Sequence, residues 1–163
     1  MIKADLHTHS TASDGTLEPE QLVARAAQRG FTHLALTDHD SVEGIARAQE
    51  EAVRWGIVLI PGVEISCNAG REVHILGYGL DPYDVALLAF FRERTLEREE
   101  RAARMVANLE KDGEKISLAR VRELAHGVMG RPHVARALVE EGYASSVSDA
   151  FDRYLVPGRC GYV

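Results

Sequence analysis

The chain has 163 residues, 45% hydrophobic and 27% charged, which is the size of one ordinary domain with its own core. Its net charge of −6 excludes a general attraction to long duplex nucleic acid or to an anionic membrane. Cys67 and Cys160 lie far apart without a CxxC pattern, which argues against a disulfide framework and a thiolate zinc site. A reducing, cytoplasmic location is expected, since neither a signal sequence nor a membrane-length apolar run appears.

The first part of the chain alternates between short extended runs and amphipathic helices, a pattern typical of βαβ units. The predicted strands are residues 2–7, 31–37, 57–60, 63–66 and 73–78. Pro61-Gly62 is expected to break the third run, and Asn68-Ala69-Gly70 to form a turn. A helix is predicted over 17–29, and Asp40 with Glu43 is expected to cap another helix that ends at Gly56. These units indicate a parallel sheet or barrel.

The character of the sequence changes after Asp81-Pro82. The predicted helices that follow are residues 84–112, 117–126, 132–141 and 148–155. We therefore divide the chain into βα units at 1–79, a helical insertion at 80–157, and a start of the return to the sheet at 158–163.

The strongest chemical signal is the pair His7 and His9 at the end of the first strand. Residues two apart in an extended chain share a face, so both imidazoles can reach one Zn²⁺, Mn²⁺ or Fe²⁺ ion. The alternative is that His7 and His9 are ordinary surface histidines. It is weakened because residues that can also bind metal, His39 and Glu64, lie at the next two predicted strand ends. Loops from parallel strands meet at that edge of a sheet. One shared metal site explains all three ends together.

Two further histidines fit the same site. His74 interrupts an apolar alternation, where its ring is expected to face the sheet interior and to need a partner; a hydrogen-bonded core histidine is the alternative. His133 follows Gly130-Arg131-Pro132, a rigid helix entry. His33 and His126 lack such a context and are taken as ordinary structural or surface histidines.

With these residues in view, the chain resembles the polymerase and histidinol phosphatase (PHP) domain family. The resemblance rests on DLHTHS (5–10) with Asp14-Gly15, TDHD (37–40), PGVEIS (61–66), VHILGYG (73–79) and GRPHVARALVEEG (130–142). It is greatest to the stand-alone branch with nucleoside 3′,5′-bisphosphate phosphatases and short-RNA 5′-to-3′ exonucleases. The resemblance implies an α/β fold: a (β/α)7 barrel with a helical insertion.

The resemblance also implies two to three divalent ions. His7 and His9 would hold the first, with Glu64 as a bridge. Glu64, His74 and His133 would hold the second, and Asp14 with His39 a third. The family's later Ala-His-Pro and Asp-x-His motifs are not in this sequence, so we expect an incomplete barrel whose open strand edges are covered by a complementing C-terminal segment or by self-association.

These features predict a metal-dependent phosphoesterase in which a metal-activated water attacks a phosphorylated small molecule, a nucleotide or a short oligonucleotide. Asp38 or Asp40 is expected to orient that water or protonate the leaving oxygen; positioning and helix capping are the alternatives. Arg94, Arg98 and Arg101 recur on one helical face and Arg131 precedes His133, so they are candidates for phosphate binding. For each arginine except Arg131, the alternative is an ordinary solvent-exposed helix position whose positive charge is balanced by nearby glutamates.

Two other functions remain open. The first alternative is a non-catalytic metal-binding module or half of a split enzyme. The second is a histidinol-phosphate-type phosphatase of small molecules. The arginine-bearing helical segment favours nucleotides over the latter.

Overall fold

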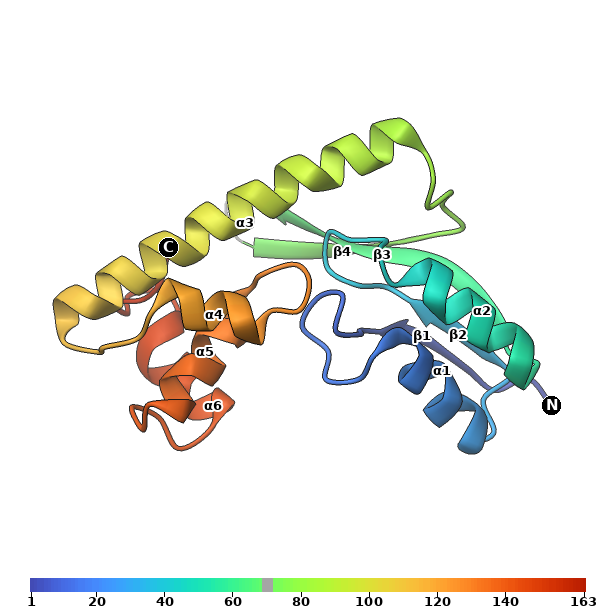
Figure 1. Ribbon diagram of the computed structural model, residues 1–163, viewed down its shortest axis with the longest axis horizontal. Helices are drawn as coiled ribbons and strands as arrows, with labels where there is room; N and C mark the ends of the chain where they lie inside the picture. Colours follow the sequence, from blue (N-terminus) through green and yellow to red (C-terminus); the bar gives the residue numbers. More distant parts are fainter. Residues whose placement is uncertain (69–71) are drawn as a thin grey trace. The chain divides into compact units, whose positions relative to one another are not determined.

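The computed structural model describes residues 1–68 and 72–163 (Figure 1). The chain forms two compact units, Met1–Arg94 and Thr95–Val163, each with its own hydrophobic core. The turn predicted at Asn68-Ala69-Gly70 falls largely outside the described ranges. Among the described helices, none has the length and apolar composition needed to cross a membrane.

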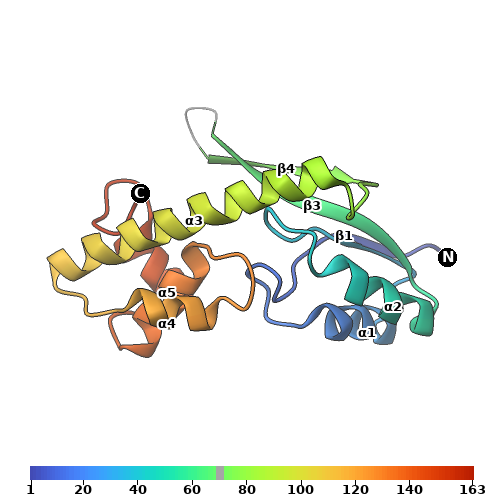
Figure 2. The same cartoon turned by 45° about the horizontal axis from the view of Figure 1, so that its top comes forward.

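The first unit is built on one curled sheet (Figure 2). Its strands, in spatial order, are β1 (Ala4–Thr8), β2 (His33–Leu36), β3 (Val58–Asn68) and β4 (Glu72–Tyr78). The first three are parallel, and β4 pairs antiparallel with β3. The mixed α/β fold with an incomplete barrel, predicted from the sequence, is confirmed.

The structure differs from the predicted break at Pro61-Gly62, because β3 runs through it as one strand. Pro61 is the last residue paired with β2, opposite Leu36, and Gly62 is the first paired with β4, opposite Tyr78. The carbonyl of Pro61 accepts a hydrogen bond from the Gly79 amide at 2.8 Å. Proline is tolerated here because its carbonyl supplies the bond and no N–H is required. The Pro-Gly step therefore marks a change of partner.

Two helices cover one face of this sheet (Figures 1 and 2). The first, α1 (Pro19–Gln28), begins at the predicted Pro19, and Gly30 ends it at φ 77°. The second, α2 (Ile45–Trp55), ends at Gly56 as predicted but begins after Gly44. The predicted Asp40 cap is therefore wrong. The Asp40 carboxylate instead accepts the backbone N–H of Ser66 at 2.9 Å, a tertiary contact that local capping rules do not anticipate.

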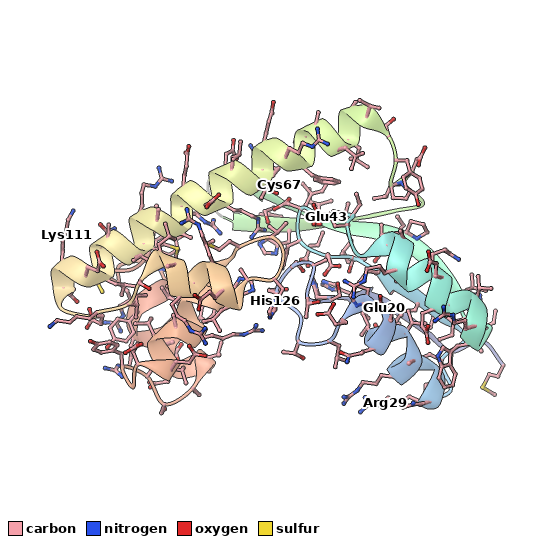
Figure 3. All side chains as sticks on the ribbon, viewed as in Figure 1. Glu20, Arg29, Glu43, Cys67, Lys111 and His126 are labelled. Carbon is pink, nitrogen blue, oxygen red and sulfur yellow. The ribbon has the colours of Figure 1, made fainter. Side chains whose placement is uncertain are left out.

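The core of the first unit lies between these helices and the sheet. Its buried side chains include Val23, Leu34, Leu36, Ala48, Leu59 and Val63. On the outer surface Arg47 of α2 donates to Glu20 of α1, whose side chain is labelled in Figure 3. Such an exposed ion pair contributes about 0–1 kcal/mol, so apolar burial is the main attachment of the helices.

The second unit is helical. Its elements are α3 (Val85–Asp112), which begins in the first unit, α4 (Leu118–Leu124), α5 (Arg131–Glu140), α6 (Val147–Ala150) and the π-helical turn η1 (Phe151–Leu155). Its core includes Met105, Leu109, Val121, Val134, Leu138 and Leu155. Residues 158–163 form turns rather than a strand, and Cys160 and Val163 pack against this core.

The close approach at Gly62 yields a stability prediction. A Cβ there would lie 2.8 Å from Thr37 Cγ2 and 3.0 Å from the Gly77 carbonyl oxygen. We expect Gly62→Ala to lower the free energy of unfolding by about 1–3 kcal/mol, because the neighbouring strands must shift. Gly77→Ala is the matched control, since its Cβ meets only Val63 Cγ1 at 3.5 Å. Urea denaturation of both variants measures the effect, and equal stabilities would contradict it.

Candidate metal centre

Polar side chains gather where β1 and β2 end, beside the middle of β3, which contains Glu64 instead of ending before it as predicted. His7 lies in β1 and His9 directly follows it, while His39 follows β2. Glu64 lies on β3 beyond the last β2 pair, and His74 lies on β4. This is the edge of a parallel α/β sheet at which functional sites form.

An isolated bridge places His39 beside Glu64. The Glu64 amide donates to the Asp38 carbonyl, and the Asp40 amide donates to the Glu64 carbonyl, both at 3.1 Å. Parallel pairing thus continues past the end of β2. The left-handed backbone of Asp40, with φ 47°, follows directly and turns the chain toward α2.

Glu64 is the centre of the cluster. Its Oε2 lies 2.8 Å from His7 Nε2, 3.0 Å from His9 Nε2 and 3.7 Å from His39 Nε2. Its Oε1 lies 3.1 Å from His74 Nδ1. The two oxygens of one carboxylate therefore face different imidazoles, which is the arrangement of a bridging ligand.

The charge state of Glu64 follows from these neighbours. Burial opposes ionisation of its carboxyl, but the hydrogen bond from His7 and the charges of His39, His9 and His7 outweigh burial. Together they hold the pKa of Glu64 below its ordinary value. Glu64 is ionised near neutral pH, as a metal ligand must be.

Asp14 reaches the cluster from the loop after β1. Its Oδ1 lies 3.5 Å from His9 Nδ1, and its Oδ2 lies 3.7 Å from His39 Nε2. Only the resemblance pointed to Asp14, because its position in a polar loop gives no chemical signal of its own. The folded loop brings it to the same edge as the strand-borne histidines.

The first unit thus contains three groups with mutually close ligand atoms: His7, His9 and Glu64; His9, Asp14 and His39; His39, Glu64 and His74. Within each group these atoms lie within 4.8 Å of one another. Ligands about 2 Å from a shared ion have similar spacings. Mixed imidazole and carboxylate donors suit Zn²⁺, Mn²⁺ or Fe²⁺. The residues present therefore fit divalent cations.

His133 belongs to the second unit, where it is buried at the start of α5. Its Nδ1 accepts the Gly130 amide proton at 3.0 Å. A neutral imidazole that accepts at Nδ1 carries its proton on Nε2, whereas a histidine that binds metal through Nε2 donates from the other nitrogen. The metal-ligand role of His133 remains a proposal, and this hydrogen bond weighs against it.

Asp38 and Asp40, the expected catalytic carboxylates, are each 1% exposed. Asp38 accepts hydrogen bonds from the Ser10 amide, the Ser10 hydroxyl and the Ser13 hydroxyl, each at 2.7 Å. Burial raises the pKa of Asp38, and those hydrogen bonds oppose the rise. Both carboxylates hold backbone in place, which favours the positioning role over direct proton transfer.

The candidate phosphate-binding arginines are distributed over both units. In the first, the Arg94 guanidinium lies 5.5 Å from the centroid of the Phe90 ring. In the second, Arg98 donates to the Met129 carbonyl at 3.3 Å, and Arg131 lies 5.7 Å from the Phe151 ring centroid. Their role toward a substrate, like that of Arg101, remains a prediction.

Ser10 and Ser13, two buried serines, were missed by the sequence reasoning. Both lie between the candidate ligands His9 and Asp14, in a stretch that reads as a solvated polar loop. Only the fold shows that a buried carboxylate from the next strand end receives their hydrogen bonds. Their position between two candidate metal ligands is the feature of the sequence that could have indicated them. Of the histidines set aside earlier, His33 lies outside the three groups, and so does the exposed His126 labelled in Figure 3.

Removal of Glu64 tests the centre directly. Glu64 belongs to two of the three groups, so we expect Glu64→Gln to weaken Mn²⁺ binding at least about tenfold. Even the loss of a residue that only holds a metal ligand in place typically lowers metal affinity about tenfold or more. Isothermal titration calorimetry with Mn²⁺ measures this. Glu50→Gln, on the exposed surface of α2, is the matched control and should bind as the unsubstituted chain does.

Comparison with known proteins places this geometry in a family. A model of the PHP domain matches residues 5–155. The 5′-3′ exoribonuclease Rnm of Escherichia coli is 45% identical, over 98% of this chain and 56% of its own. The 3′,5′-nucleoside bisphosphate phosphatase of Chromobacterium violaceum is 42% identical, over 100% of this chain and 58% of its own. A solved Bifidobacterium adolescentis structure, provisionally described as a metal-dependent phosphoesterase, matches with a TM-score of 0.90 and 33% identity, over 98% of this chain and 57% of its own. The chain spans little more than half the length of these relatives, and it belongs to the PHP domain family.

Proposed function

We propose that this chain carries the metal centre of a phosphoesterase that hydrolyses phosphate monoesters of nucleotides or the ends of short oligonucleotides. The observation that carries the proposal is the Glu64 carboxylate, which faces His7, His9, His39 and His74 at 2.8–3.7 Å. Two to three divalent ions, Mn²⁺, Zn²⁺ or Fe²⁺, are the proposed cofactors. Such a centre suits reactions in which water attacks phosphorus.

The proposed mechanism uses the residues in separate roles. Divalent cations bound here supply a water of lowered pKa and offset charge on the phosphoryl oxygens. Glu64 has 8% of its side chain exposed, whereas His7 has 49% and His74 31%. A phosphate group would therefore meet these histidines before it meets the Glu64 carboxylate. With a water activated in this way, the reaction would need no nucleophile from the protein.

The proposed substrate class rests on the relatives. One is named an exoribonuclease and another a nucleoside bisphosphate phosphatase, and both names describe phosphate esters of nucleotides. Arg94, Arg98 and Arg131 are the proposed phosphate-binding side chains, because guanidinium groups pair with phosphate in a bidentate manner. The net charge of −6 favours small substrates held locally over long nucleic acid.

We also propose that further polypeptide pairs with the sheet. β1 and β4 are the two edge strands of the described sheet; Leu6 on β1 is 45% exposed and Ile75 on β4 is 55% exposed. An open edge with apolar side chains favours strand addition, either from a complementing segment or from a second copy. Sedimentation equilibrium of the purified chain distinguishes the two, because only self-association makes the apparent mass rise with concentration.

Phosphate release tests the proposed activity. With Mn²⁺ added, we expect the chain to release phosphate from a nucleoside 3′,5′-bisphosphate, and we expect His9→Ala to reduce kcat/KM by about 100-fold or more, since His9 belongs to two groups. His33→Ala is the control, because His33 lies outside the three groups and is held by Thr32. A 5′-phosphorylated RNA trinucleotide, with products separated by chromatography, tests the exonuclease alternative.

The other outcomes identify the competing functions. Faster release from histidinol phosphate than from either nucleotide substrate supports the small-molecule phosphatase. Stoichiometric Mn²⁺ binding without turnover of any substrate supports a non-catalytic module or half of a split enzyme. Turnover that persists equally in His9→Ala and Glu64→Gln would exclude this centre as the source of activity.

A further inference from the structure

The loop of residues 10–15, which carries Asp14, is fastened to the end of β2 by one carboxylate. Asp38 Oδ1 accepts from the Ser10 amide and the Ser13 hydroxyl, and Asp38 Oδ2 accepts from the Ser10 hydroxyl. All three distances are 2.7 Å, which is short for the N–H donor of Ser10 and ordinary for the two hydroxyl donors. The loop therefore takes its position from Asp38.

These contacts are fully enclosed. Ser10 is 0% exposed, and Ser13 and Asp38 are each 1% exposed. Removing one partner from a buried hydrogen-bonded group is costly in free energy, because the polar group that remains has neither its partner nor water to bond. The Ser10 hydroxyl also accepts the Ala12 amide at 3.1 Å, so the same bonds set the backbone inside the loop.

The fastening affects the three ligand groups unequally. Asp14 is the one loop residue among their members, and it belongs only to the group with His9 and His39. Ser13, which is not a member of that group, contacts two of its members. Its hydroxyl lies 3.5 Å from His9 Nδ1 and 3.4 Å from Asp14 Oδ1. The group of His39, Glu64 and His74 contains no residue of the loop.

We infer that Asp38, through Ser10 and Ser13, is a positioning residue that selectively sets the affinity of the His9, Asp14 and His39 position for a divalent cation. The inference rests on the proposed metal centre and assigns Asp38 a role other than proton transfer. Loss of the fastening lets Asp14 move away from His9 and His39. The cation positions around Glu64 retain their ligands.

Metal counting and amide exchange test the inference in the purified chain. Ser13→Ala removes the hydroxyl that donates to Asp38 and its longer contacts with His9 and Asp14, with little change in volume. Asp38→Ala removes all three hydrogen bonds from the loop to this carboxylate and leaves the Ser13 contacts to His9 and Asp14 in place. By elemental analysis after desalting from Mn²⁺, we expect each variant to hold one ion fewer than the unsubstituted chain, or to bind its weakest ion at least about tenfold less tightly. In the metal-free protein we expect faster hydrogen exchange of the Ser10 amide, which needs no activity measurement.

Double variants locate the effect. In an Asp14→Ala background, Ser13→Ala should cause no further loss of metal, whereas in a His74→Ala background the two losses should add. Ser41→Ala is the matched control, because this serine is 3% exposed and its hydroxyl accepts only the Glu43 amide among the described contacts.

Each result bears on a separate proposal. Unchanged metal content and affinity in Ser13→Ala and Asp38→Ala overturn the inference, while the metal centre stands. Additive losses in the Asp14→Ala background overturn it as well. A chain that binds no Mn²⁺ at all overturns the metal centre itself. If Asp38→Ala fails to fold, Ser13→Ala still decides the question.

Discussion

The candidate metal centre of the first unit depends on the interaction of one buried carboxylate, Glu64, with the imidazoles around it. Glu64 reaches them because β3 continues beyond β2 and changes partner at Pro61-Gly62. The strand thus pairs with β2 before this step and with β4 after it. A ligand in its middle can face His39 after β2 and His74 on β4 at once. The long strand is therefore the element that joins the separate ligand groups.

The second requirement is that loops hold candidate ligands as firmly as strands do. His74 takes its position from regular pairing with β3, and His7 lies on β1 where the register with β2 shifts between Asp5 and Thr8. Asp14 lies in a loop without strand pairing. The buried hydrogen bonds from Ser10 and Ser13 to Asp38 supply that support. Asp38 also contributes its carbonyl to the bridge that holds Glu64. Asp38 thereby holds the loop through its carboxylate and β3 through its backbone carbonyl.

Much of the fold and of the candidate site was predictable from the sequence, and the failures share a cause. The Asp40 cap and the break at Pro61-Gly62 were local predictions overruled by contacts with distant residues. His74 was expected inside the sheet but lies exposed on it, because strand alternation identifies a face and not what covers that face. The serines 10 and 13 were missed because burial of a polar loop depends on which strand end lies beneath it.

The sequence by itself determined the βα order of the first unit, the helical character of the second, and the candidate ligands near the ends of β1 and β2. Those features follow from periodicity and residue chemistry, which act over a few neighbouring positions. Only the tertiary structure decided that Glu64 lies among four histidines and that Asp38 holds a loop. It also showed that His133 accepts a backbone proton at Nδ1. These facts depend on strand register and on side-chain distances between residues far apart in the chain, which no local pattern encodes.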